Sequence, residues 1–276
     1  MKESMSLLAN TQPESRPEIF WTLDNSWVLT KRSLKHIIRN IDQLLSTFLM
    51  PVMFLLLFRY VFGGAINTGD TSYVNFLVAG ILVQTAAFGA NTTTFSVLVD
   101  LQRGIVDRFR ALPMASSALL AAHVIADLVR NTISALVMLV ASFLVGFRPT
   151  ADLSEWLLVL GLLLLFTLAI SWVSAILGMV VKSLEAAQWS GFMVLMPLTF
   201  ASSAFVPTAS MPTVLRVFAE NQPVTHVIEA MRAWMVGTPI GNSGWLALFW
   251  CTGIIVIAMP VATWIFRSRT SDPRPG

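Results

Sequence analysis

The sequence has little of the chemistry that metal sites, disulfides and nucleotide sites need. It contains one cysteine, Cys251, and three histidines in 276 residues. A single cysteine excludes an internal disulfide and any metal site with several cysteine ligands. The metalloprotease motif H-E-x-x-H and the nucleotide-binding motif G-x-x-x-x-G-K-[ST] are both absent. No catalytic residue, metal ligand or cofactor-binding residue is therefore predicted in this chain.

Charge is also scarce. Charged residues make up 12% of the chain and hydrophobic residues 55%, whereas soluble domains carry about 25% charged residues. The apolar runs are long and continuous, and they do not alternate as the strands of a membrane barrel do. The sequence therefore predicts an all-α integral membrane protein, located in the cell membrane with several membrane passes.

The apolar pattern divides the chain into four regions. Residues 1–23 and 269–276 are predicted to be flexible tails. Residues 24–42 are predicted to form an amphipathic helix on the membrane surface, with a cytosolic extension of the first span as the alternative. Residues 43–268 form the transmembrane domain. Its six predicted spans cover about 44–62, 73–99, 119–147, 156–181, 186–207 and 245–266.

The basic residues predict the orientation of these spans. Most lysines and arginines fall in the N-terminal region, in the loops after the second and fourth spans, and in the C-terminal tail. The segments predicted to lie outside hold only Arg59, Arg148, Arg216 and Arg232. Because basic residues are retained on the cytoplasmic side of a membrane, both termini are predicted to be cytoplasmic.

Residues 208–242 are too apolar for an ordinary loop and too irregular for a span. They predict two short helices, joined near Gln222-Pro223, that re-enter the outer leaflet before the sixth span. A helical cap above the bilayer is the alternative. Glu229 and Arg232 stand at i and i+3, a spacing at which they could form an ion pair.

Several polar residues lie inside the predicted spans. Asp127 and Arg130 share a helix face at i, i+3 and predict an intramembrane ion pair; a proton relay is the alternative. Other uncharged polar residues are candidates for lining a translocation path, or for hydrogen bonding between helices. These candidates are Gln84, Asn91, Thr92, Ser171 and Gln188.

The stretch Asp100–Pro113 concentrates charge between the second and third spans. As a helix it would place Leu101, Ile105 and Phe109 on one face and Arg103 with Asp107 on another. An apolar face for the bundle and a charged face for the cytoplasm suit docking of a soluble partner. A plain positively charged loop is the alternative.

The same stretch resembles a known family. The run LQRGIVDRFRALPM at 101–114 resembles the cytoplasmic signature of ABC-2-type permeases, especially the daunorubicin-resistance branch, although Ala111 stands where serine is usual. Asp127–Asn131 resembles the D-x-x-R-N pattern of that branch, and Phe205–Pro207 and Asn221–Thr225 match further motifs. The resemblance implies six helices, the surface helix, the re-entrant outer pair and a coupling helix before the third span. The residues implied to couple to an ATPase are Arg103, Gly104, Asp107, Arg108, Phe109, Arg110 and Pro113.

This resemblance implies the permease subunit of an ATP-driven exporter. Two separate cytoplasmic ATPase subunits would carry ATP and Mg, and two permeases, identical or related, would pair in the membrane. The apolar interior favours a hydrophobic or amphipathic substrate such as a drug, an antibiotic or a lipid. No nucleic acid partner is expected. The alternatives are an ATP-independent transporter or channel, and a lipid-modifying membrane enzyme that would use His226 and Glu229.

Overall fold

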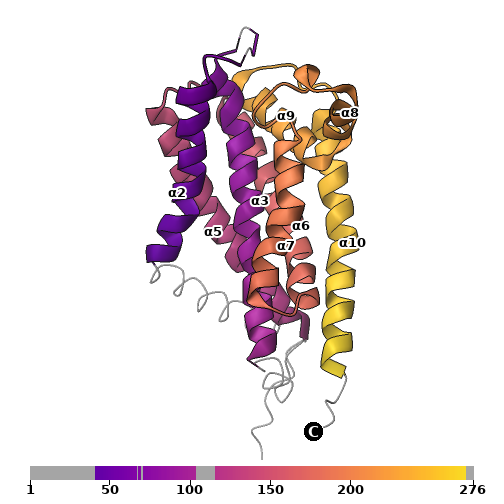
Figure 1. Cartoon of the computed structure of the whole chain (residues 1–276). Helices are drawn as coiled ribbons and strands as arrows, with labels where there is room; N and C mark the ends of the chain where they lie inside the picture. The colour runs from indigo at the N-terminus through magenta and orange to yellow at the C-terminus, as the bar shows by residue number, and fades with distance from the viewer. Residues whose placement is uncertain (1–40, 67, 70, 104–115, 272–276) are drawn as a thin grey trace, which may run out of the picture.

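The computed structural model describes residues 41–66, 68–69, 71–103 and 116–271, and every regular element in them is helical (Figure 1). The helices are α2 (Ile41–Leu57), the π-helix η1 (Phe58–Phe62), α3 (Tyr73–Gln102), α5 (Ser116–Leu144), α6 (Leu153–Val180), α7 (Leu184–Phe200), the 3₁₀ turn η2 (Thr208–Ser210), α8 (Thr213–Asn221), α9 (Pro223–Val236) and α10 (Ser243–Ser271). The surface helix predicted at 24–42 lies almost wholly outside the described residues.

Four helices are long and apolar enough to cross a membrane. They cover Tyr73–Gln102, Leu120–Leu144, Leu153–Val180 and Ser243–Ser268. A span needs about 20 apolar residues, so these helices confirm the prediction of a helical integral membrane protein. The apolar stretch Leu49–Phe62 and the 17-residue helix α7 are shorter.

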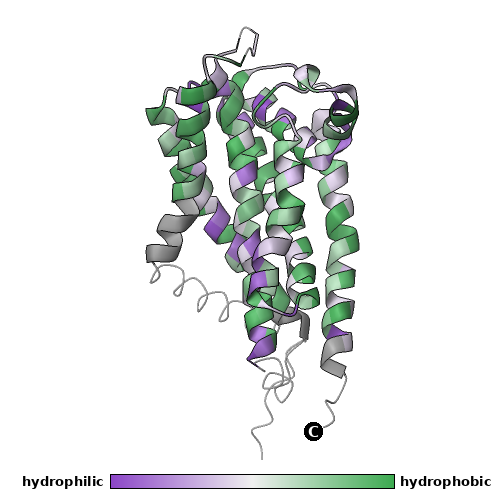
Figure 2. Cartoon of the chain, in the orientation of Figure 1, coloured by the Kyte–Doolittle hydropathy of each residue, from purple (hydrophilic) through white to green (hydrophobic). Residues whose placement is uncertain are grey.

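Helices α2, α3, α5, α6, α7 and α10 run in alternating directions through one bundle (Figure 1). The described chain begins and ends at the same end of the bundle, and α8 and α9 lie at the opposite end. Hydrophilic residues gather at the two ends and on parts of α3 and α5, while the outer helices are predominantly hydrophobic (Figure 2). This distribution is the one expected of a bundle with a lipid-facing exterior.

Helix α3 is the centre of the bundle. Within its most apolar stretch 89% of the residues are buried, against 22% for α10. It packs against α2, α5, α6, α7 and α9. Any polar side chain on α3 therefore needs a partner on a neighbouring helix or in a cavity.

Helix α7 ends at Phe200, before the predicted boundary at residue 207. Ala201 leaves the helical conformation, with φ −87° and ψ 49°. The side-chain amide of Gln222 donates to the carbonyl oxygens of Leu198 and Ala201, both at 2.7 Å. Because the last carbonyls of a helix have no partner within it, these two hydrogen bonds stabilise the early end of α7.

The outer segment forms two helices that meet at Gln222, as the sequence predicted, but they differ in burial. Helix α8 is largely exposed, and Arg216 and Glu220 form an ion pair on it at 2.8 Å. Helix α9 packs against α3, α6 and α10, and most of its residues are buried. Pro223 occupies its first turn and Gly237, at φ +76°, ends it, as is usual for helix starts and ends.

Candidate functional site

The charged stretch Asp100–Pro113 is described only as far as Arg103. The side chain of Arg103 is exposed, and its backbone N–H donates to the carbonyl oxygen of Val99 at 3.0 Å, at the end of α3. The other predicted coupling residues lie outside the described residues: Gly104, Asp107, Arg108, Phe109, Arg110 and Pro113.

Two contacts fix the end of α3 from which this stretch emerges. The Nε2 atom of His123, on α5, lies 2.8 Å from Oδ2 of Asp100. The side-chain amide of Gln102 donates to the carbonyl oxygen of Lys182, between α6 and α7, at 3.2 Å. The end of α3 is thus held by polar contacts with α5 and with the connection between α6 and α7.

Inside the bundle, α3, α5 and α6 meet at a buried ion pair between Asp127 and Arg130. Asp127 also accepts hydrogen bonds from Ser171 on α6, at 2.5 Å, and from Thr92 on α3, at 3.2 Å. Arg130 donates to Thr92 and to the carbonyl oxygen of Gly89. Buried charges are tolerated when they are paired and hydrogen bonded, so this polar cluster binds three helices together.

The close approach of α3 and α5 beside this cluster depends on Gly89. A Cβ atom at this position would overlap the side-chain amide of Asn131. Small residues let helices in a membrane approach closely enough for polar contacts to form between them. Gly89 therefore sets the distance at which Arg130 reaches the backbone of α3.

An apolar cavity of about 500 Å³ lies beside α3, between α2 and α7. Its volume falls in the range of small-molecule sites, about 300–1,000 Å³. Aromatic and methionine side chains provide most of its wall. The lining residues are Met50, Pro51, Phe54, Gln84, Thr85, Phe88, Gly89, Thr92, Phe192, Met196 and Phe200.

Gln84 is the polar residue that distinguishes this cavity. The residue is 4% exposed, and neither its amide nitrogen nor its amide oxygen has a hydrogen-bond partner among the described residues. An unpaired amide in an apolar environment costs about 1–3 kcal/mol. Both atoms are buried, so a ligand with a donor and an acceptor could satisfy them only after the Gln84 side chain turns toward the cavity. Gln84 is therefore a candidate for polar recognition there.

The five predicted path-lining residues have different places in the structure. Gln84 and Thr92 line the cavity. Ser171 is not a lining residue and instead donates to Asp127. Asn91 packs against Gly191 on α7, where a Cβ atom would overlap the Asn91 amide, and Gln188 is exposed on α7.

The model of the ABC-2 type transporter family matches residues 25–236, which is most of this chain. The chain belongs to the ABC-2 type transporter family. As a permease of this family it is a transport subunit without a nucleotide-binding domain, and such permeases work with an ATPase subunit. This agrees with the lack of a nucleotide-binding motif in its sequence.

Individual relatives of this permease have similar lengths. The daunorubicin resistance ABC transporter permease protein DrrB1 of Streptomyces coeruleorubidus is 29% identical over 96% of this chain and 92% of its own length. The "Probable doxorubicin resistance ABC transporter permease protein DrrC" of Mycobacterium tuberculosis strain H37Rv is 27% identical over 87% of this chain and 88% of its own. The "Putative transport permease ycf38" of Cyanophora paradoxa is 27% identical over 81% of this chain and 78% of its own length.

The apolar residues of the cavity are functional candidates that the sequence did not single out. On α3, Phe88 lies one turn after Gln84 and one turn before Thr92, so it shares the helix face of these two predicted residues. That spacing was a usable signal on the permease's central helix. Phe54, Phe192 and Phe200 belong to other helices, and their place beside α3 is a property of the packed bundle.

The pair predicted between Glu229 and Arg232 is replaced by separate interactions. Arg232 donates to the carbonyl oxygens of Phe76, at 3.0 Å, and Ser203, at 2.6 Å. Glu229 accepts from the hydroxyl of Ser243 at 2.8 Å. The buried guanidinium thus satisfies the backbone of other elements, and Glu229 is held by the start of α10.

Proposed function

We propose that this permease exports a hydrophobic or amphipathic substrate, and that the cavity between α2, α3 and α7 binds it. The observation that supports this most is the unpaired Gln84 amide in a wall of aromatic and methionine side chains. Such a wall favours apolar ring systems, while one amide recognises a single polar group. The relatives named for daunorubicin and doxorubicin resistance are consistent with a substrate of this class.

The proposed topology has six spans with both termini in the cytoplasm. Helices α2 and α7 run beside the four long helices over part of their length (Figure 1). Seventeen residues of α7 extend about 26 Å at 1.5 Å per residue, slightly less than a bilayer core of about 30 Å. The exposed Arg103 and Lys182 lie at the end where the described chain begins and ends, which supports a cytoplasmic assignment for that end.

Burial of α9 supports a re-entrant outer segment over a cap above the bilayer. Val227, Ile228 and Met231 are 0% exposed because α9 inserts among α3, α6 and α10. Irregular backbone is tolerated at membrane depth where protein covers it. The exposed helix α8 would then lie at the membrane surface.

The ATPase subunits would act on the permease at the stretch 100–113. Two ATPase subunits, which carry ATP and Mg, would bind two permeases through Arg103, Asp107, Arg108 and Arg110 on this stretch. The contacts of Asp100 with His123 and of Gln102 with Lys182 support such a role, because they link the start of the stretch to α5 and to the α6–α7 connection. Motion at the stretch would thereby reach helices that line the cavity.

The test compares two glutamine substitutions in the permease expressed with its ATPase subunit. Gln84→Met keeps the size of the side chain and removes the amide, whereas Gln188→Met makes the same change on an exposed face of α7. ATP-dependent efflux of a panel of amphipathic fluorescent compounds is measured in membrane vesicles. Gln84→Met should reduce efflux of hydrogen-bonding compounds by about tenfold relative to apolar ones, and Gln188→Met should not.

The coupling step has its own variant. Arg108→Glu should abolish ATP-dependent efflux and co-purification with the ATPase while membrane insertion stays normal.

An unchanged efflux profile for Gln84→Met would refute the substrate site. Efflux by the permease without the ATPase, driven by an ion gradient, would instead favour the ATP-independent transporter.

A further inference from the structure

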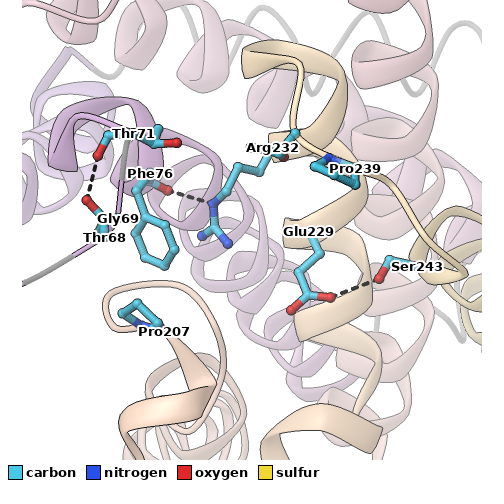
Figure 3. Close-up of a pocket in the computed structure, with 10 residues that line it drawn as sticks. Thr68, Gly69, Thr71, Phe76, Pro207, Glu229, Arg232, Pro239 and Ser243 are labelled. Atoms are coloured by element: carbon cyan, nitrogen blue, oxygen red, sulfur yellow. Dashed lines mark hydrogen bonds between the residues drawn. The ribbon is translucent and has the colours of Figure 1, made fainter.

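A second pocket, of about 390 Å³, lies at the end of the bundle that carries α8 and α9 (Figure 3). The first turn of α3, helix α9 and the start of α10 contribute to its wall. It shares no lining residue with the cavity between α2, α3 and α7. Unlike that cavity, it contains a carboxylate and a guanidinium.

Arg232 forms a fixed positive charge in this pocket. Its guanidinium stacks over the ring of Phe76, 3.6 Å from the ring centroid, and is held by hydrogen bonds from Nε to the Phe76 carbonyl and from Nη2 to the Ser203 carbonyl. The residue is 7% exposed. Its Nη1 atom has no hydrogen-bond partner among the described residues, so these N–H groups remain for a ligand.

Glu229 forms a fixed negative charge one helical turn away. Its Oε2 atom accepts a hydrogen bond from Ser243 at 2.8 Å, and its Oε1 atom has no donor in the described part of the chain. Figure 3 shows Arg232 reaching from α9 over Phe76 and Glu229 directed toward Ser243. The pocket therefore offers one unused acceptor and one unused set of donors on the same helix.

We propose that this pocket binds the zwitterionic phosphoethanolamine headgroup of a membrane lipid. A ligand with a single charge would be repelled by either Glu229 or Arg232, whereas a zwitterion can place its phosphate near the guanidinium and its ammonium near the carboxylate. A primary ammonium can donate hydrogen bonds to Oε1. A quaternary ammonium cannot, and the Phe76 face it would otherwise use is covered by Arg232.

The position of the pocket favours a lipid over a soluble zwitterion. Helices α3 and α10 begin at this end, and Phe76 in the first turn of α3 and Ser243 at the start of α10 line the pocket. Trp245, two residues further along α10, is 78% exposed, as is typical of tryptophans at the headgroup level. Headgroups are thus the abundant zwitterions at the depth where the pocket lies.

Native mass spectrometry of the purified full-length protein tests the proposal. The protein is titrated with phosphatidylethanolamine, its dimethyl derivative, phosphatidylcholine and phosphatidylglycerol of identical acyl chains. Phosphatidylethanolamine should bind at least tenfold more tightly than phosphatidylcholine and phosphatidylglycerol. The affinity of the dimethyl derivative should lie between those of phosphatidylethanolamine and phosphatidylcholine. Glu229→Gln should lower its affinity to that of phosphatidylcholine.

Glu155→Gln, at a half-buried capping position on α6, is the matched control and should keep the preference. Thermal unfolding shows whether Glu229→Gln is folded. If it is not, Ser243→Ala, which removes the hydrogen bond that holds the Glu229 carboxylate, should still weaken the binding of phosphatidylethanolamine selectively. Equal affinity of the wild type for all four lipids would overturn the proposal, and so would an unchanged preference in folded Glu229→Gln. Displacement of bound lipid by an equal concentration of soluble glycerophosphoethanolamine would overturn the assignment to a lipid.

Discussion

Replacement of Asp127 by leucine should destabilise the bundle strongly, because the carboxylate is completely buried and binds groups on three helices. It pairs with Arg130 and accepts hydrogen bonds from Thr92 and Ser171. Leucine has a similar size but accepts no hydrogen bond. The substitution leaves the Arg130 guanidinium with Thr92 and the Gly89 carbonyl as partners and without a countercharge.

The size of the effect follows from what remains buried. Removing one partner of a buried ion pair costs about 3–5 kcal/mol, and each lost hydroxyl contact about 1 kcal/mol, so a loss of about 3–5 kcal/mol is expected when the structure relaxes in part. Replacing both charges, as Asp127→Leu with Arg130→Met, removes the unpaired charge. The double variant should therefore lie within about 1–2 kcal/mol of the wild type.

The assay is reversible unfolding of the purified protein in mixed micelles, titrated with sodium dodecyl sulfate and followed by tryptophan fluorescence. A double-mutant cycle gives the interaction free energy of the pair. Arg216→Met in the exposed ion pair with Glu220 is the control and should cost less than about 1 kcal/mol. A cost for Asp127→Leu near the ~0.6 kcal/mol average of hydrogen bonds between membrane helices, or a double variant as unstable as the sum of the singles, would refute this reasoning.

Two further predictions concern helix packing and helix capping. Gly89→Ala should cost about 1–3 kcal/mol in the same unfolding assay because its Cβ would overlap Asn131, whereas Gly161→Ala, which meets no atom within 4 Å, should be neutral or stabilising. The backbone N–H of Glu155 lowers the pKa of Asp152, so the stabilisation by this cap is present above the ordinary aspartate pKa and is lost as the pH falls through the lowered value. Asp152→Asn should remove that acid dependence from the melting temperature; an unchanged pH profile would contradict the capping role.

The helical membrane architecture could be predicted from the sequence, because continuous apolar runs have few other stable forms in a bilayer. The spacing of Asp127 and Arg130 likewise indicated a local ion pair, since residues three apart on a helix are neighbours. The same spacing allowed a pair between Glu229 and Arg232, but no direct ion pair joins them among the described residues. There, buried carbonyl groups of distant segments, among them that of Phe76, compete for the guanidinium, and sequence spacing carries no information about them.

The cavity could be predicted only in part. Gln84 and Thr92 were recognisable because a polar residue in an apolar span needs a hydrogen-bond partner or a ligand. The aromatic wall was not, since Phe54, Phe192 and Phe200 come together only when α2 and α7 pack against α3. The charged stretch 104–115 and the surface helix predicted before α2 lie outside the described residues, so their roles stay predictions.

The two polar features of α3 constrain how the cavity can open. Thr92 and Gly89 line the cavity and also bind Arg130, so the α3 side of the wall is locked to α5 and α6 by a buried ion pair. Among the described residues no hydrogen bond joins α3 to α2 or α7, whose contacts with the cavity are made by aromatic and methionine side chains. Apolar contacts of this kind can slide at little cost, whereas separating α3 from α5 would expose a charge. We therefore expect α2 and α7 to move during transport while α3, α5 and α6 remain one rigid unit.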